Sequence, residues 1–69
     1  MSAIGHAVRR LREERGWTQA ELGEKVGLDG TNIARREKGT TKVKPAERFK
    51  FAEAFGMPVI EFDEAWRLF

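Results

Sequence analysis

The segment WTQAELGEKVGLDGTNIARREKG, residues 17–39, predicts two short helices joined by a tight turn. Thr18 and Glu21 have the spacing of a capping box, in which each side chain satisfies a free backbone N–H at the start of the helix. Gly27 suits the left-handed residue that ends this helix, and Asp29 is a good N-cap for the next one. Because helices this short are marginal alone in water, we expect further helices to pack behind them.

The second helix of this pair carries polar side chains on its predicted outer face. Ile33 is expected to point inward, whereas hydrogen-bond donors lie on the other side: Thr31, Asn32, Arg35 and Lys38. A short helix that presents donors and positive charge outward, held at an angle by a preceding short helix, has the form of a unit that reads the DNA major groove.

The sequence on either side predicts more helices. Over residues 3–15, an apolar face recurs at helical spacing in Ile4, Val8 and Leu11. Pro45 suits the first turn of another helix. We expect that helix to end at Phe55, with an apolar face formed by Phe49, Ala52 and Phe55 and with Phe51 beside it.

A last helix is expected over residues 58–67, where apolar side chains recur at three- and four-residue spacing. No stretch alternates as a β-strand does, so we predict an all-α chain folded as a compact five-helix bundle. We expect a single domain over residues 1–69, with the helix-turn-helix at residues 18–38.

The composition argues against several functional classes. The chain lacks cysteine, which removes disulfides, thiolate metal sites and thiol catalysis and fits a cytoplasmic protein. His6 is the only histidine, Ser2 is the only serine and tyrosine is absent, so neither a metal cluster nor a nucleophile–base pair can be assembled. We therefore predict neither an enzyme nor a cofactor. No apolar run reaches membrane-spanning length.

The charges are distributed unevenly along the chain. Residues 1–44 carry ten Lys and Arg against six Asp and Glu, whereas residues 45–69 carry three against five. Chance could produce this asymmetry in a short chain, but it also suits a polyanion bound on one side only. Double-stranded DNA is the partner that fits both this asymmetry and the predicted two-helix unit.

Several motifs occur in a fixed order along the chain: Thr18-Gln19-x-x-Leu22, Gly27, Ile33 and Glu37-x-Gly39. In this order and spacing, the chain resembles the Cro/lambda-repressor-type helix-turn-helix family, also called the XRE family, over nearly its whole length. The resemblance implies a lambda-repressor-like, DNA-binding, usually dimeric transcriptional regulator whose second helix-turn-helix element enters the major groove.

The resemblance also implies roles for individual residues. Gln19 matches the family's phosphate-contacting glutamine, Thr31 and Arg35 match its base-reading positions, and Asn32 is close enough to contact a base or the backbone. The alternative for Arg35 is a solvated surface side chain, and for Thr31 and Asn32 it is capping at the start of the helix. Lys38 is expected to contact a phosphate, and Lys42 and Lys44 are expected to contact phosphates or the minor groove.

Arg12 and Glu37 match a structural ion pair that links the first helix to the end of the third. Three positions in or next to the third helix depart from the family pattern, and so does Arg48 in the fourth. Gly30 stands where a long base-reading side chain is common, and Asp29 adds a negative charge near phosphates. Arg36 replaces an apolar residue, so we expect it either to lay its stem against the core or to contact the DNA backbone.

The C-terminal apolar stripe allows two interpretations. Val59 and Phe62 could simply belong to the core. Exposed aromatic clusters usually mark an interface, and we therefore assign a dimer interface to Phe62, Trp66, Leu68 and Phe69.

The predicted function is a sequence-specific, double-stranded-DNA-binding transcriptional regulator, a homodimer on a palindromic operator with half-sites roughly 34 Å apart. The alternative is an antitoxin or adaptor-type protein-interaction module that uses the same fold. The aromatic stripe and the acidic second half of the chain favour that alternative, with a toxin or other protein as the partner.

Overall fold

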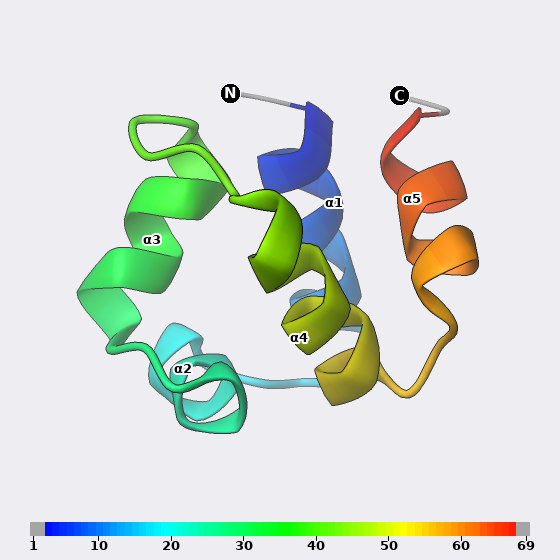
Figure 1. Ribbon diagram of the computed structural model, residues 1–69. Helices are drawn as coiled ribbons and strands as arrows, with labels where there is room; N and C mark the ends of the chain where they lie inside the picture. The colour runs from blue at the N-terminus through cyan, green and yellow to red at the C-terminus, as the bar shows by residue number, and fades with distance from the viewer. Residues whose placement is uncertain (1–2, 68–69) are drawn as a thin grey trace.

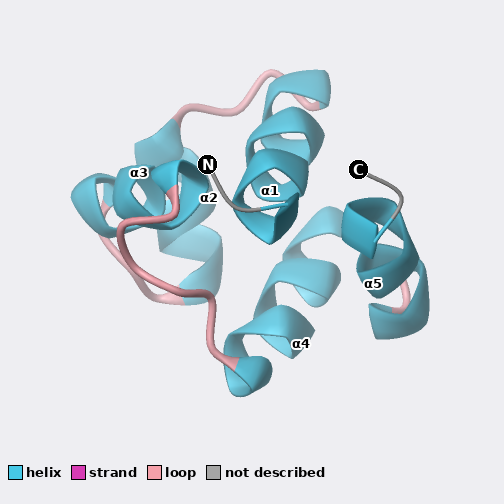
Figure 2. Ribbon diagram, turned by 90° about the horizontal axis from the view of Figure 1, so that it is seen from above, coloured by secondary structure: helices cyan, strands magenta, loops and turns pink. Residues whose placement is uncertain are grey.

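The computed structural model describes residues 3–67. Five α-helices follow one another along the chain: α1 (Ala3–Glu14), α2 (Gln19–Val26), α3 (Gly30–Lys38), α4 (Pro45–Phe55) and α5 (Val59–Arg67). The described residues contain no strand, so the prediction of an all-α, five-helix fold is confirmed (Figures 1 and 2). None of these helices is long and apolar enough to cross a membrane.

Local hydrogen bonds fix the ends of α2 and the start of α3. The Glu21 backbone N–H donates to Thr18 Oγ1 at 3.0 Å and the Thr18 N–H donates to Glu21 Oε1 at 2.9 Å, which completes the predicted capping box. Gly27 ends α2 with φ of 77°, a left-handed conformation that glycine adopts without steric cost. Asp29 Oδ1 then accepts from the Asn32 N–H at 2.8 Å and caps α3.

The core lies where all five helices meet. Its buried members are Val8, Leu22, Val26, Ile33, Phe51, Ala52, Phe55 and Phe62. The core contains a row of stacked aromatic rings. Phe51 stacks with Phe55 and with Phe62 at centroid distances of 6.4 Å, and Trp17 stacks on Phe55 at 6.0 Å. Large aromatic side chains each remove much apolar area from water when they are buried, which favours folding of a chain this short.

The structure corrects two assignments made from the sequence. Phe49 is 58% exposed, whereas Phe51 is fully buried. At 3.6 residues per turn the two lie about 200° apart around the helix, so the inner face of α4 includes Phe51 and leaves Phe49 outside. Phe62 is also fully buried in the core of its own chain, and its assignment to a dimer interface is wrong. Leu68 and Phe69 lie outside the described residues.

The helices are arranged so that α3 and α5 lie on opposite sides of the molecule. Figure 1 shows α3 at the left and α5 at the right, with α1 and α4 between them, and the view from above in Figure 2 agrees. An outward face on α3 is therefore separated by the core from an outward face on α5.

Candidate nucleic-acid interface

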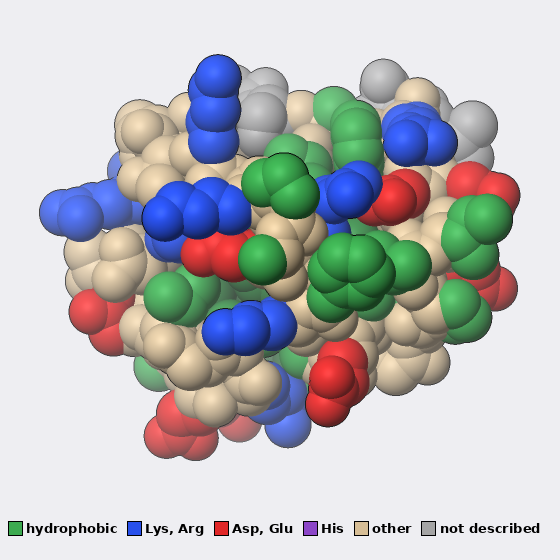
Figure 3. Space-filling view, viewed as in Figure 1, with side chains coloured by type: hydrophobic (Ala, Val, Ile, Leu, Met, Phe, Trp, Pro, Cys, Tyr) green, Lys and Arg blue, Asp and Glu red, His purple; other side chains and the backbone are tan. Residues whose placement is uncertain are grey.

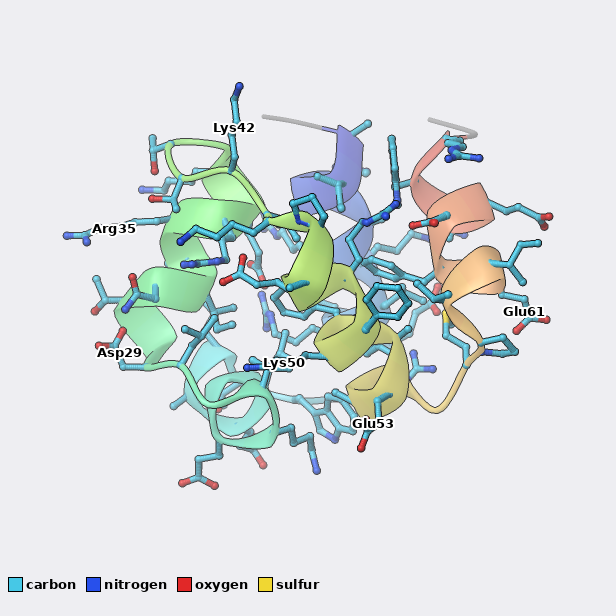
Figure 4. All side chains as sticks on the ribbon, viewed as in Figure 1. Asp29, Arg35, Lys42, Lys50, Glu53 and Glu61 are labelled. Carbon is cyan, nitrogen blue, oxygen red and sulfur yellow. The ribbon has the colours of Figure 1, made fainter. Side chains whose placement is uncertain are left out.

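The outer face of α3 carries the side chains that could read DNA. Ile33 is fully buried beneath the helix, whereas Thr31, Arg35 and Lys38 are exposed and Asn32 is half-buried. Figure 4 shows Arg35 extending outward from the side of α3 that faces away from α4 and α5. Exposed donors on a short helix with one buried face give the geometry that major-groove contact requires.

The contact between α2 and α3 explains one departure from the family pattern. A Cβ at Gly30 would lie 3.3 Å from the backbone nitrogen of Ala20 and 3.4 Å from its Cα. The missing side chain at Gly30 therefore serves close packing between the starts of the two helices. Gly30 therefore offers no side chain for contact with DNA, and the exposed side chains of α3 come from the positions that follow it.

A buried ionic network joins α1, α2 and α3. Arg12 Nε and Nη2 donate to the two Glu37 carboxylate oxygens at 2.7 and 3.1 Å, as in the ion pair that the resemblance implies. Arg12 Nη1 also donates to the Trp17 carbonyl at 2.8 Å. The hydrogen bonds to Glu37 raise the pKa of the Arg12 guanidinium above its ordinary value, although burial opposes this change.

Gln19 takes part in the same network. Its Nε2 donates to Glu37 Oε1 at 3.2 Å, which holds the half-buried side chain at the start of α2. Because an amide nitrogen carries two hydrogens, this bond leaves a second N–H that could point toward a phosphate. The bond fixes the orientation of the amide group, which sequence reasoning did not anticipate.

The loop after α3 is tied back to that helix. The Arg35 carbonyl accepts hydrogen bonds from the backbone N–H groups of Gly39, Thr40 and Thr41 at 3.0, 3.0 and 3.3 Å. Lys42 and Lys44 follow in this loop and are exposed. Figure 4 shows Lys42 extending away from the body of the molecule, and Figure 3 shows Lys and Arg side chains gathered over the part that α3 and this loop occupy.

Sequence reasoning missed Glu47 as a member of this region. Its carboxylate oxygens accept from Arg36 Nε at 3.1 Å and from Arg36 Nη2 at 2.9 Å. Arg36 is only 6% exposed, so of the two expectations for this residue the inward placement applies, with the charged head bound to protein. An acidic residue in the first turn of α4, two positions after Pro45, was the available signal for a partner.

Glu47 also predicts a pH dependence of stability. Burial alone would raise its pKa, but hydrogen bonds from Arg36 and from the Lys44 backbone, together with their charges, outweigh burial and lower the pKa below its ordinary value of 4.5. Because the folded-state pKa is the lower one, the stabilisation is complete well above 4.5 and is lost as the pH falls through the folded-state pKa.

We therefore expect the unfolding free energy of wild type to be higher than that of a Glu47→Gln variant at pH 7. At about pH 3 this difference should be smaller. Urea unfolding of both proteins at the two pH values measures this. A difference that stays constant with pH would contradict the assignment of this pKa to Glu47.

Comparison with known proteins places this geometry in a family. Residues 3–65 match the family model described as a helix-turn-helix domain. Over 56 residues the chain is 39% identical to a competence pilus inhibition repressor of Acinetobacter baylyi, a match that covers 81% of this chain and 51% of that protein. The chain thus spans about half the length of this curated relative.

Solved structures with the same fold include two bacterial regulators. The restriction-modification controller protein C.AhdI of Aeromonas hydrophila is 28% identical, with a TM-score of 0.79 over 87% of this chain and 91% of that one. The clp gene regulator ClgR of C. glutamicum is 24% identical, with a TM-score of 0.86 over 96% of this chain and 86% of that one. At this identity, the likeness to ClgR concerns the fold alone.

The match of the family model covers nearly all of the described residues, and the match to the repressor relative covers 81% of the chain. The matched family consists of transcription factors, which are not enzymes. The chain therefore belongs to the helix-turn-helix family of DNA-binding transcriptional regulators of the XRE type.

Proposed function

We propose that this chain recognises a specific DNA sequence by placing α3 in the major groove, and that it acts in the cytoplasm. The exposure of Arg35 on the outer face of α3, above the buried Ile33, is the observation that carries the proposal. Arg35 would bond guanine O6 and N7 together, with Thr31 and Asn32 as neighbouring contacts. The phosphate contacts are assigned to Gln19, Lys38, Lys42 and Lys44.

We also propose that two copies of the chain bind together through the α5 side. Phe49 of α4 and Ile60 of α5 are 58% and 65% exposed, and Trp66 is half-buried at the end of α5. Because α3 lies away from α5 (Figure 1), a contact between two copies through α5 leaves the outer face of α3 uncovered in each copy.

Selection of bound sites from a random pool of DNA duplexes, at near-physiological salt, tests the function and the dimer together. We expect a palindrome whose half-sites are about one turn apart. Enrichment of a single half-site would contradict the dimer but support the reading helix. If no sequence is enriched, the specific regulator is wrong, and the protein-interaction module remains, with Phe49 and Ile60 as its surface.

An Arg35→Ala variant is expected to lose discrimination at one base pair of each half-site. A bidentate arginine–guanine contact contributes roughly 1–3 kcal/mol of discrimination, so we expect about a 5- to 150-fold smaller preference for the selected base over its alternatives. Titration of the variant against the selected operator and single-base variants measures the preference.

Lys38→Ala is the matched control for Arg35→Ala. A lost phosphate contact weakens binding to all sequences alike and lowers the salt slope by about 1. Equal discrimination by wild type and the Arg35→Ala variant would show that another residue reads that base.

A further inference from the structure

The buried pair Arg36–Glu47 connects the reading helix to the helix after it. The guanidinium lies against both carboxylate oxygens, at 3.1 Å from Nε and 2.9 Å from Nη2, and the side chains are 7% and 16% exposed. Arg36 Nη1 also donates to the backbone carbonyl of Asn32 at 3.1 Å. One side chain therefore joins the first half of α3 to the start of α4.

The same carboxylate fixes the end of the basic loop. Glu47 Oε1 accepts from the Lys44 backbone N–H at 2.9 Å, so the last loop residue is bound to the group that holds Arg36. At its start, the loop is bound to the Arg35 carbonyl through Thr40 and Thr41. Between these two anchors lies Val43, which packs against the core, and beside it Lys42.

We propose that Arg36 and Glu47 are positioning residues for DNA binding. The pair binds both the carbonyl of Asn32 in α3 and the N–H of Lys44 at the end of the loop. It thereby sets the position of Lys42 and Lys44 relative to Arg35. When α3 lies in the major groove, the two lysine side chains are then placed to contact phosphates. The inference rests on the proposed function and adds to it the device that aligns the two kinds of contact.

Stability alone is a weak explanation for this pair. Removing two charges from water is costly, and apolar residues of similar volume often replace a buried ion pair without loss of stability. Apolar side chains could not accept the Lys44 N–H or donate to the Asn32 carbonyl. An anchored loop also loses less conformational freedom when DNA is bound, which favours binding.

The test replaces the pair by apolar residues, with the double substitution Arg36→Met and Glu47→Leu. One positive and one negative charge are removed together, so the net charge of the chain stays the same. We measure the urea midpoint and the affinity for the selected operator across a range of salt concentrations. The urea midpoint is expected to stay at or above that of wild type, while the affinity falls about tenfold and the salt slope becomes shallower by about 1 to 2 per protomer.

The matched control is the double substitution Arg9→Ala and Glu13→Ala. This exposed pair on α1, with N–O distance 3.5 Å, also removes one charge of each sign. We expect wild-type affinity and salt slope. In addition, Lys42→Ala with Lys44→Ala should lower the salt slope in wild type and have little further effect once Arg36 and Glu47 have been replaced.

The outcomes separate this inference from the function on which it rests. A folded Met/Leu variant with the affinity and salt slope of wild type would overturn the positioning role and leave the regulator intact. Absence of specific, salt-dependent binding by wild type would overturn the proposed function itself. If the Met/Leu variant does not fold, Arg36→Lys serves instead. Lysine keeps the buried charge paired but lacks the planar fork, so a smaller loss of salt slope supports the inference and an unchanged slope overturns it.

Discussion

A Glu37→Ala variant is expected to lose about 3–5 kcal/mol of unfolding free energy, a large part of the total for a domain of this size. The side chains of Arg12 and Glu37 are 11% and 3% exposed, so the substitution leaves a guanidinium buried without its carboxylate. Gln19 loses its acceptor in the same step. Urea unfolding followed by circular dichroism measures the loss, and we expect a variant that is partly or wholly unfolded at room temperature.

Two further variants show whether the cost comes from the unpaired charge. Glu13→Ala removes an equally charged side chain that is exposed on α1, and we expect a change of about 0.5 kcal/mol or less. Replacing both partners, Arg12→Met with Glu37→Leu, should be less destabilising than Glu37→Ala alone, because no charge then remains buried. A Glu37→Ala variant as stable as Glu13→Ala would show that water reaches Arg12 and relieves it.

Local signals explain why the elements could be predicted from the sequence. Thr18 with Glu21, and Gly27 after them, fix their helix through contacts within a few residues, so the order of residue types is sufficient to locate it. Pro45 begins α4 and Gly56 ends it for the same reason. The resemblance then supplied the arrangement of the helices, which no local signal contains.

The points that the sequence left open or assigned wrongly depend on how the helices face one another. Phe49 and Phe51 are both compatible with an apolar face, and only the position of α4 against its neighbours decides that Phe51 is inside. Arg36 pairs with Glu47, eleven residues away in the sequence, because the loop brings the start of α4 beside α3. The lack of a side chain at Gly30 is explained by the Ala20 backbone beside it, a contact between two helices that the sequence alone does not reveal. The DNA-contacting roles remain predictions until binding is measured.

A Gly23→Ala variant is expected to lose about 3 kcal/mol or more of unfolding free energy. In the interior of a helix, alanine ordinarily adds about 1 kcal/mol of stability relative to glycine, so the expected sign is the reverse of the usual one. A Cβ at Gly23 would lie 2.3 Å from the Leu28 carbonyl oxygen. Overpacking typically costs 1–3 kcal/mol and occasionally more. Backbone atoms cannot rotate away as a flexible side chain can, so the turn between α2 and α3 must open, and we expect a cost above that typical range.

Gly27→Ala is the control for Gly23→Ala, because Gly27 also lies in the helix-turn-helix but has nothing within 4 Å of its Cβ position. Its φ of 77° makes alanine strained there, at a cost of about 1–2 kcal/mol. Urea unfolding of both variants should therefore rank Gly23→Ala as the more damaging.

The opened turn would also break the 2.8 Å bond from the Leu28 N–H to the Gly23 carbonyl and change the angle of α3. Any folded Gly23→Ala protein should therefore bind the selected operator more weakly than Gly27→Ala. Higher stability of Gly23→Ala than of wild type would show that the turn is free to move, and that the close contact of α2 with the turn does not hold α3 in place.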